Sequence, residues 1–174
     1  MAGRWLRTEA NPTDYVAGVL AGLLGALEIL GVMGVTYRRQ RGDALMFPRQ
    51  LSSLVLGEDA ARRRNGMGPA AVGVGLHVPL QAVSGALFAL LVSRVVVLNR
   101  ALMGLAYGLG LWWLVWGVVF PRLRPGVAPA GADLWILGAA HAVSGFILGS
   151  VPMRWTAGGV RRVRRRAPQR AGLG

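Results

Sequence analysis

Four long apolar stretches constrain the fold of this chain more than any other feature: residues 15–35, 70–93, 101–120 and 134–153. Each is about 20 residues long, and a helix rising about 1.5 Å per residue needs that length to cross about 30 Å of hydrocarbon. Together they contain a single charged residue, Glu28. Helices on the surface of a soluble domain alternate apolar and polar faces, and these stretches do not. The sequence therefore predicts an all-α polytopic membrane protein with four transmembrane helices.

The composition supports this fold class and excludes several function classes. Hydrophobic residues make up 53% of the chain and the mean hydropathy is +0.46, which leaves no room for a second, soluble domain. The chain has no cysteine, which excludes disulfides, thiolate metal sites and thiol catalysis. Abundant Ala, Gly, Arg and Val with few Ile is typical of GC-rich bacterial coding. We therefore expect a multi-pass protein of the bacterial inner membrane.

The net charge of +13 does not indicate a nucleic-acid-binding protein. All 20 basic residues are arginines, and they lie in loops and tails beside the apolar stretches. In those places they meet anionic lipid headgroups, at roughly 1 kcal/mol each. The arginines that we assign to headgroups are Arg38, Arg39, Arg62, Arg63 and Arg64.

The chain divides into a polar N-terminal segment (1–14), a transmembrane domain (15–153) and a basic tail (154–174). The tail combines arginines with Gly, Ala and Pro, and we expect it to be disordered. The long loop 36–69 contains an amphipathic stretch at about 48–56, which predicts a small helix lying in the membrane interface. Pro121 is predicted to end the third span.

A short motif recurs in the second and fourth spans. Residues 82–85 and 142–145 both read A-V-S-G, and the first and third spans share a G-x-x-x-G spacing. This pattern predicts two helical hairpins in tandem that pack through small residues, unless the short string recurs by chance. The predicted packing residues are Gly18, Gly22, Gly85, Gly104, Gly108 and Gly145.

Three ionisable residues lie within the predicted spans: Glu28, His77 and His141. Such groups are costly in a membrane and are functional candidates by default. All three lie roughly 10 Å from the same face at about 1.5 Å per residue, so they predict one polar layer, which Gln81 and Ser144 join. We expect direct or water-bridged hydrogen bonding between Glu28 and one of the histidines, because an unpaired buried carboxylate costs several kcal/mol.

Several roles for this layer remain open. Glu28 and a histidine would hold helices together, or Glu28 would exchange protons in a proton-coupled transporter. His77 and His141 would ligate a haem or chlorophyll-type pigment, or all three would bind a divalent metal. The helical ligand pairs typical of metal sites are missing from the sequence, so our prediction includes no metal and no cofactor.

The apolar spans resemble those of two groups of membrane proteins. The segments VAGVLAGLLGALEIL, LHVPLQAVSGALFALL, LMGLAYGLGLWWLVW and HAVSGFILG resemble those of small uncharacterised bacterial four-span membrane proteins, over about half of the chain. That resemblance implies the fold and no activity. The lone glutamate in ALEILG is similar to the one in small multidrug resistance exporters, which implies exchange of protons and cations at Glu28. This chain departs from those exporters by its length, its long first loop and its two histidines.

The sequence carries no catalytic signature. It has no G-x-S-x-G elbow, P-loop or H-E-x-x-H motif, and only 7 acidic residues. We therefore predict an integral membrane protein without catalytic activity, acting as a small subunit or accessory protein of a larger bacterial membrane assembly. Its expected partners are membrane lipids and other membrane subunits or a second copy, and not nucleic acid.

Overall fold

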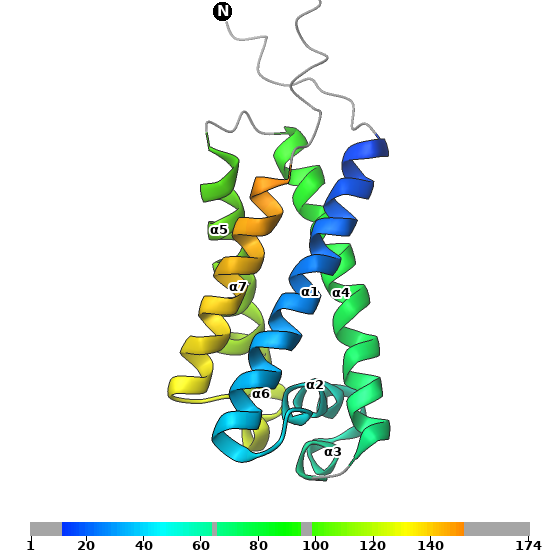
Figure 1. Cartoon of the computed structure of the whole chain (residues 1–174), viewed down its shortest axis with the longest axis vertical. Helices are drawn as coiled ribbons and strands as arrows, with labels where there is room; N and C mark the ends of the chain where they lie inside the picture. The colour runs from blue at the N-terminus through cyan, green and yellow to red at the C-terminus, as the bar shows by residue number, and fades with distance from the viewer. Residues whose placement is uncertain (1–11, 64–65, 95–98, 152–174) are drawn as a thin grey trace, which may run out of the picture.

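The computed structural model describes residues 12–63, 66–94 and 99–151, and within these ranges all regular structure is helical. Four helical segments are long and apolar enough to cross a membrane, which confirms the predicted all-α, four-helix membrane fold (Figure 1). Three of them begin and end as α1 (Pro12–Arg41), α4 (Met67–Arg94) and α7 (Ala132–Ser150). The predicted polar segment and basic tail lie almost entirely outside the described residues, as does Arg64.

The remaining span is assembled from three consecutive helical pieces. The α-helix α5 (Arg100–Trp112) continues as the π-helix η1 (Trp113–Val119) and then as α6 (Phe120–Leu123). The sequence prediction that Pro121 ends this span is therefore wrong. Pro121 lies in the first turn of α6, where the absence of its N–H and its fixed φ are tolerated.

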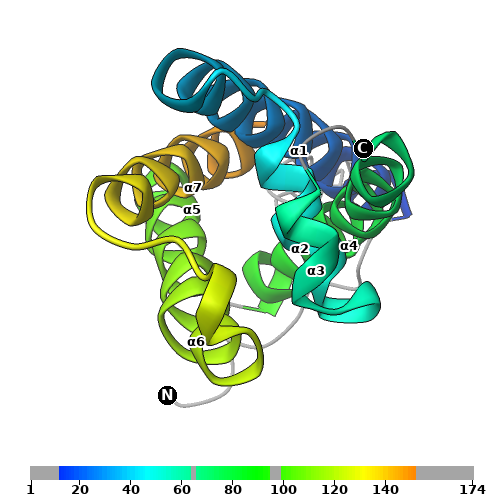
Figure 2. The same ribbon diagram turned by 90° about the horizontal axis from the view of Figure 1, so that it is seen from below.

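The four spans form an open arc and not a closed square. Helices α1 and α7 pack side by side in the middle, with α4 on the far side of α1 and α5 on the far side of α7 (Figures 1 and 2). The outer helices α4 and α5 contact each other little, mainly through Tyr107, whose hydroxyl lies 3.1 Å from Ser84 Oγ. The helix pairs α1–α4 and α5–α7 therefore meet along two lines, which we call seams. The seam between α1 and α7 is closed, and the seam between α4 and α5 is open.

Glycines allow two of the helix pairs to approach to backbone contact. A Cβ atom added to Gly18 would lie 2.4 Å from the Gly85 carbonyl oxygen, between α1 and α4. A Cβ added to Gly104 would lie 2.1 Å from the Gly145 carbonyl oxygen, between α5 and α7. Lipid is as apolar as the side chains, so membrane helices associate through close contacts of this kind. The predicted packing glycines thus face neighbouring helices.

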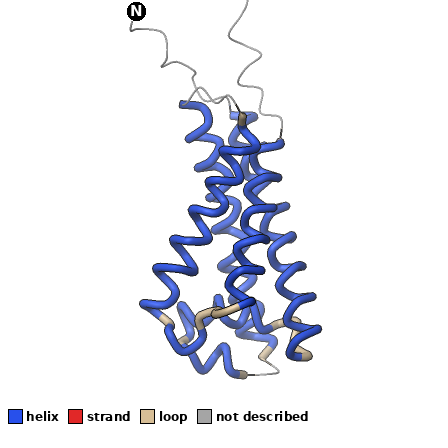
Figure 3. Tube along the Cα trace, turned by 90° about the vertical axis from the view of Figure 1, so that its left-hand side faces the viewer, coloured by secondary structure: helices blue, strands red, loops and turns tan. Residues whose placement is uncertain are grey.

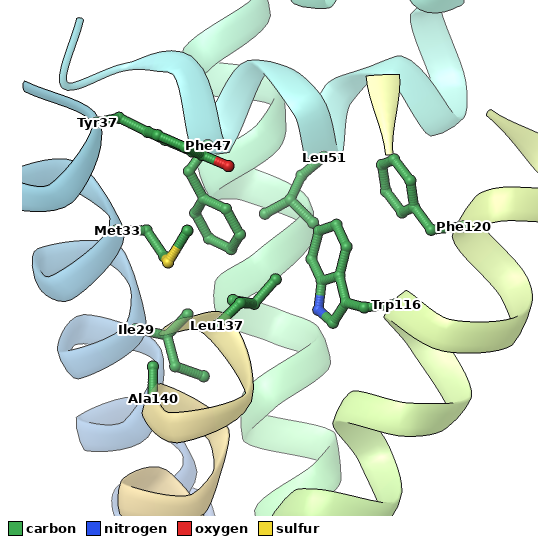
Figure 4. Packing of buried hydrophobic residues seen from close by; sticks show 9 residues of the cluster. All are labelled: Ile29, Met33, Tyr37, Phe47, Leu51, Trp116, Phe120, Leu137 and Ala140. Carbon is green, nitrogen blue, oxygen red and sulfur yellow. The ribbon is translucent and has the colours of Figure 1, made fainter. Parts of the chain in front are cut away.

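Three short helices cover one end of the arc: α2 (Met46–Leu56), α3 (Glu58–Arg62) and the 3₁₀ turn η2 (Pro125–Val127) (Figures 2 and 3). The helix predicted near 48–56 is present, but its apolar face contacts protein. Phe47 and Leu51 are buried in the main core cluster beside Trp116 (Figure 4). The full cluster is Ile29, Met33, Tyr37, Phe47, Leu51, Trp116, Phe120, Leu137 and Ala140. Helix α2 thus fills the end of the arc as a wedge.

Candidate functional site

The two histidines of the predicted polar layer are both buried, at 7% and 6% exposure for His77 and His141. His141 Nδ1 lies 2.9 Å from the Leu137 carbonyl oxygen, one turn earlier on α7. The imidazole of His77 hydrogen-bonds the backbone of Ala26 on α1, and lies within electrostatic range of His141. Its Nε2 atom is buried and has no hydrogen-bond partner among the described residues. The two rings are therefore held by backbone groups of the bundle interior.

Glu28 is separated from this pair. Its side chain is half-buried, and its Oε2 atom has no hydrogen-bond partner in the described part of the chain. The predicted direct hydrogen bond to a histidine is therefore not formed, and only a water-bridged contact stays a prediction. Nor do three His, Cys, Asp or Glu side chains converge into a metal-binding group anywhere in the described ranges. The side chains of the predicted polar layer therefore do not form one centre in the described residues.

The other polar residues of the layer take part in helix contacts. Ser144 packs against Gly25, where an added Cβ would lie 2.1 Å from the serine Oγ. The carbonyl of Gln81 lies against Gly22, at 2.1 Å from the corresponding Cβ position. The Tyr107 hydroxyl donates to the carbonyl oxygen of Ser84 at 3.0 Å. These groups hold helices together and do not line a common site.

A pocket of about 530 Å³ lies at the end of the bundle that α2 and α3 cover. The residues that line it come from five segments: the end of α1, the loop and α2 that follow, α3, the turn η2 with its loop, and the start of α7. The lining residues are Arg41, Asp43, Met46, Arg49, Gln50, Ala61, Arg62, Gly126, Val127, Ala128, Pro129, Ala130 and Asp133. Charged side chains and apolar loop residues share its wall.

Ion pairs organise the charges of this pocket. Arg41 donates to Asp133 Oδ2 at 2.5 Å and so joins α1 to α7. Arg49, which is 1% exposed, pairs with Asp43. Arg62 is exposed and lies 3.2 Å from Glu58 Oε2 on its own helix. A buried ion pair has to offset a desolvation cost of several kcal/mol per ion, whereas an exposed pair such as that of Arg62 contributes little.

Hydrogen bonds beneath the pocket tie α2 to the loop before α7. Tyr37 donates to Gln50 Oε1 at 3.1 Å, and Gln50 Nε2 donates to the Val127 carbonyl oxygen at 3.1 Å. Arg124 Nε donates to the Ser53 carbonyl oxygen at 2.6 Å. These bonds fix the walls of the pocket although the bonded segments lie far apart in the sequence.

This pocket was not predicted from the sequence. Its buried polar members, Arg49, Gln50 and Asp133, were not among the predicted site residues, and Arg62 was assigned to lipid headgroups. One signal was available: Arg41 and Asp133 are opposite charges at the ends of two spans on the same side of the membrane. Such a pair is a candidate contact only once the two spans are known to be neighbours.

Comparisons with protein-family models, with curated proteins and with solved structures find no match for this chain. The site is therefore interpreted from its own geometry.

Proposed function

We propose that this chain is an integral membrane protein without catalytic activity, which acts as a small subunit or accessory protein of a larger bacterial membrane assembly. The observation that carries the proposal is the open seam between α4 and α5. Side chains such as Leu80 and Leu87 on α4 and Leu102 on α5 are more than half exposed. Lipid covers such faces on any membrane protein, but the asymmetry between the two seams favours a partner helix at this one.

Small residues on the outer helices support a helix as the partner. Gly75 on α4 and Gly110 on α5 have no atom within 4 Å of an added Cβ, so their backbones are accessible. The six predicted packing glycines contact neighbouring helices inside the bundle, so they are not available to a partner. Three serine hydroxyls take part in structural hydrogen bonds: Ser52 and Ser53 donate to carbonyls of their own helix, and Ser84 bonds Tyr107.

We also infer that the bundle arose as two tandem hairpins from one ancestral pair. Gly18 and Gly22 contact the carbonyls of Gly85 and Gln81. At corresponding positions of the A-V-S-G repeat, Gly104 and Gly108 contact the carbonyls of Gly145 and His141. If the short string recurred only by chance, the two copies would not be expected to make the same contacts.

Crosslinking tests the subunit proposal directly, because a chain without cysteine accepts single cysteines cleanly. We would attach a photo-crosslinker to Leu87→Cys on α4 or Leu102→Cys on α5 in cell membranes, with Leu24→Cys on the exposed face of α1 as the matched control. All three leucines are 53–61% exposed. We expect one crosslinked species from α4 and α5, absent from α1, that also copurifies in fixed ratio in mild detergent. A protein that migrates alone and crosslinks equally weakly from all three positions would show the proposal to be wrong.

One observation favours a second function, a small proton-coupled transporter. The buried Oε2 of Glu28 lacks a hydrogen-bond partner among the described residues, which is the setting of a carboxylate that takes up and releases a proton. Uptake into liposomes driven by a proton gradient, present in the wild type and lost in Glu28→Gln, would favour it. The visible spectrum of the same preparation tests the pigment alternative, since a Soret band that disappears in His77→Ala would indicate a haem.

A further inference from the structure

We propose that the pocket at the α2 end of the bundle binds a phosphate ester that also carries a primary ammonium group, the chemistry of a phosphoethanolamine headgroup. The inference does not depend on the subunit proposal. The pocket volume of about 530 Å³ falls within the usual range for small-molecule sites, about 300–1,000 Å³.

The charges of the lining match both ends of such a ligand. Three arginines and two aspartates line the pocket: Arg41, Arg49, Arg62, Asp43 and Asp133. A guanidinium donates two parallel hydrogen bonds to a phosphate, and a carboxylate pairs with an ammonium. An anion without an ammonium would face the two aspartates, and a cation without a phosphate would face the three arginines. A zwitterion satisfies both sets.

The ion pairs place buried charge beside open space. If the buried Arg49–Asp43 pair served only to join the segments, apolar residues of similar size would do so without the desolvation cost. Instead the charged groups surround a cavity that they do not fill. A divalent cation is a poorer occupant, because no group of three acidic or histidine ligands is found in the described residues.

The position of the pocket explains the source of the ligand. It lies where α1 ends and α7 begins, which is the end of two spanning helices and is where we expect the hydrocarbon to end. Phospholipid headgroups are concentrated at that level. Arg62, whose side chain is 61% exposed, pairs within the described ranges with carboxylates on its own short helix and is available to a phosphate.

The test uses the full-length protein, delipidated in detergent, with native mass spectrometry and titration of phosphatidylethanolamine, phosphatidylglycerol and phosphatidylcholine. We expect phosphatidylethanolamine to bind most tightly, because only it joins a phosphate to a primary ammonium. Arg62→Gln should weaken its binding about fivefold to tenfold, which corresponds to about 1–1.4 kcal/mol. The matched control is Arg122→Gln, an exposed arginine on α6 that donates to the Val118 carbonyl and does not line the pocket.

Parallel titrations of free phosphoethanolamine and of inorganic phosphate identify the source of the ligand. Binding of the lipid alone supports a headgroup that enters from the membrane, and binding of free phosphoethanolamine supports a soluble ligand of the same chemistry. Equal binding of the three lipids, or an equal effect of Arg62→Gln and Arg122→Gln, would overturn the proposal. Thermal unfolding of both variants, expected to match the wild type, shows that a loss of binding is not a loss of fold.

Discussion

The closed seam between α1 and α7 and the open seam between α4 and α5 differ at corresponding positions. Counted from the matching glycines Gly18 and Gly104, Gly25 of α1 corresponds to Leu111 of α5. Gly25 lets Ser144 of α7 approach until the serine Oγ lies where a Cβ would be. The A-V-S-G counterpart of that serine, Ser84, instead bonds the Tyr107 hydroxyl at the open seam. The packed helix pair thus has a glycine where the uncovered pair has a leucine.

The largest loss of stability is expected at glycines that make the same helix contact in both halves of the chain. A Cβ added at Gly22 or Gly108 would lie only 2.1–2.2 Å from a backbone carbonyl oxygen, and Gly22→Leu and Gly108→Leu would each place a whole side chain there. Because backbone cannot rotate away as a side chain does, each substitution should cost about 3 kcal/mol or more. Chemical unfolding in detergent measures the cost. Similar losses would support two equivalent helix pairs, and tolerance at one site would break the equivalence.

A smaller loss of stability is expected when Gly25 at the closed seam is replaced by leucine, the residue at the corresponding position of α5. In Gly25→Leu the obstacle is the side chain of Ser144, which can move, so we expect a loss of about 1–3 kcal/mol and a wider separation of α1 from α7. Spin labels on single cysteines in the two helices report that separation. Gly31→Leu is the control, because no atom lies within 4 Å of a Cβ there. An unchanged α1–α7 distance in Gly25→Leu would contradict our account of the seam.

At the open seam, the Tyr107 hydroxyl of α5 makes hydrogen bonds to Ser84 of α4. Tyr107→Phe removes the bonds to the hydroxyl and carbonyl of Ser84, and should cost about 0.5–1.5 kcal/mol. A double-mutant cycle with Ser84→Ala separates the hydroxyl–hydroxyl contact from the bond to the carbonyl. Additive losses would mean that the two hydroxyl groups do not interact.

The smallest effect belongs to the uncovered glycines. Gly110→Ala meets no atom within 4 Å, so we expect the stability of the isolated protein to change by no more than about 1 kcal/mol, in the stabilising direction. Gly104→Ala, on the same helix but facing α7, is the matched comparison and should be clearly destabilising. Equal effects at the two positions would show that α5 is packed on both faces.

The sequence predicts the spans and their packing better than it predicts the site. The apolar runs define four helices and the repeat identifies the contacting glycines, because both depend on local patterns. Helix α1 continues six residues beyond its apolar run, since Tyr37 and Arg41 find partners there in α2 and α7. The pocket depends on contacts between residues about 70–90 positions apart, which no local pattern encodes. Glu28 and the histidines were expected to meet because of their positions along the spans, but helix rotation also determines which side chains meet.

The wedge helix α2 also has a consequence for the order of assembly. It follows α1 in the chain, yet its buried residues contact α4, η1 and the segment around Val127, which are made later. As each span enters the membrane in turn, α2 has no completed place until the third span and its following loop have arrived. Until then Phe47 can pack only on α1 and α4, and Arg49 has its partner Asp43 but not the later segments that enclose it. A chain stopped before residue 124 would therefore be incomplete at the end of the bundle that carries the pocket.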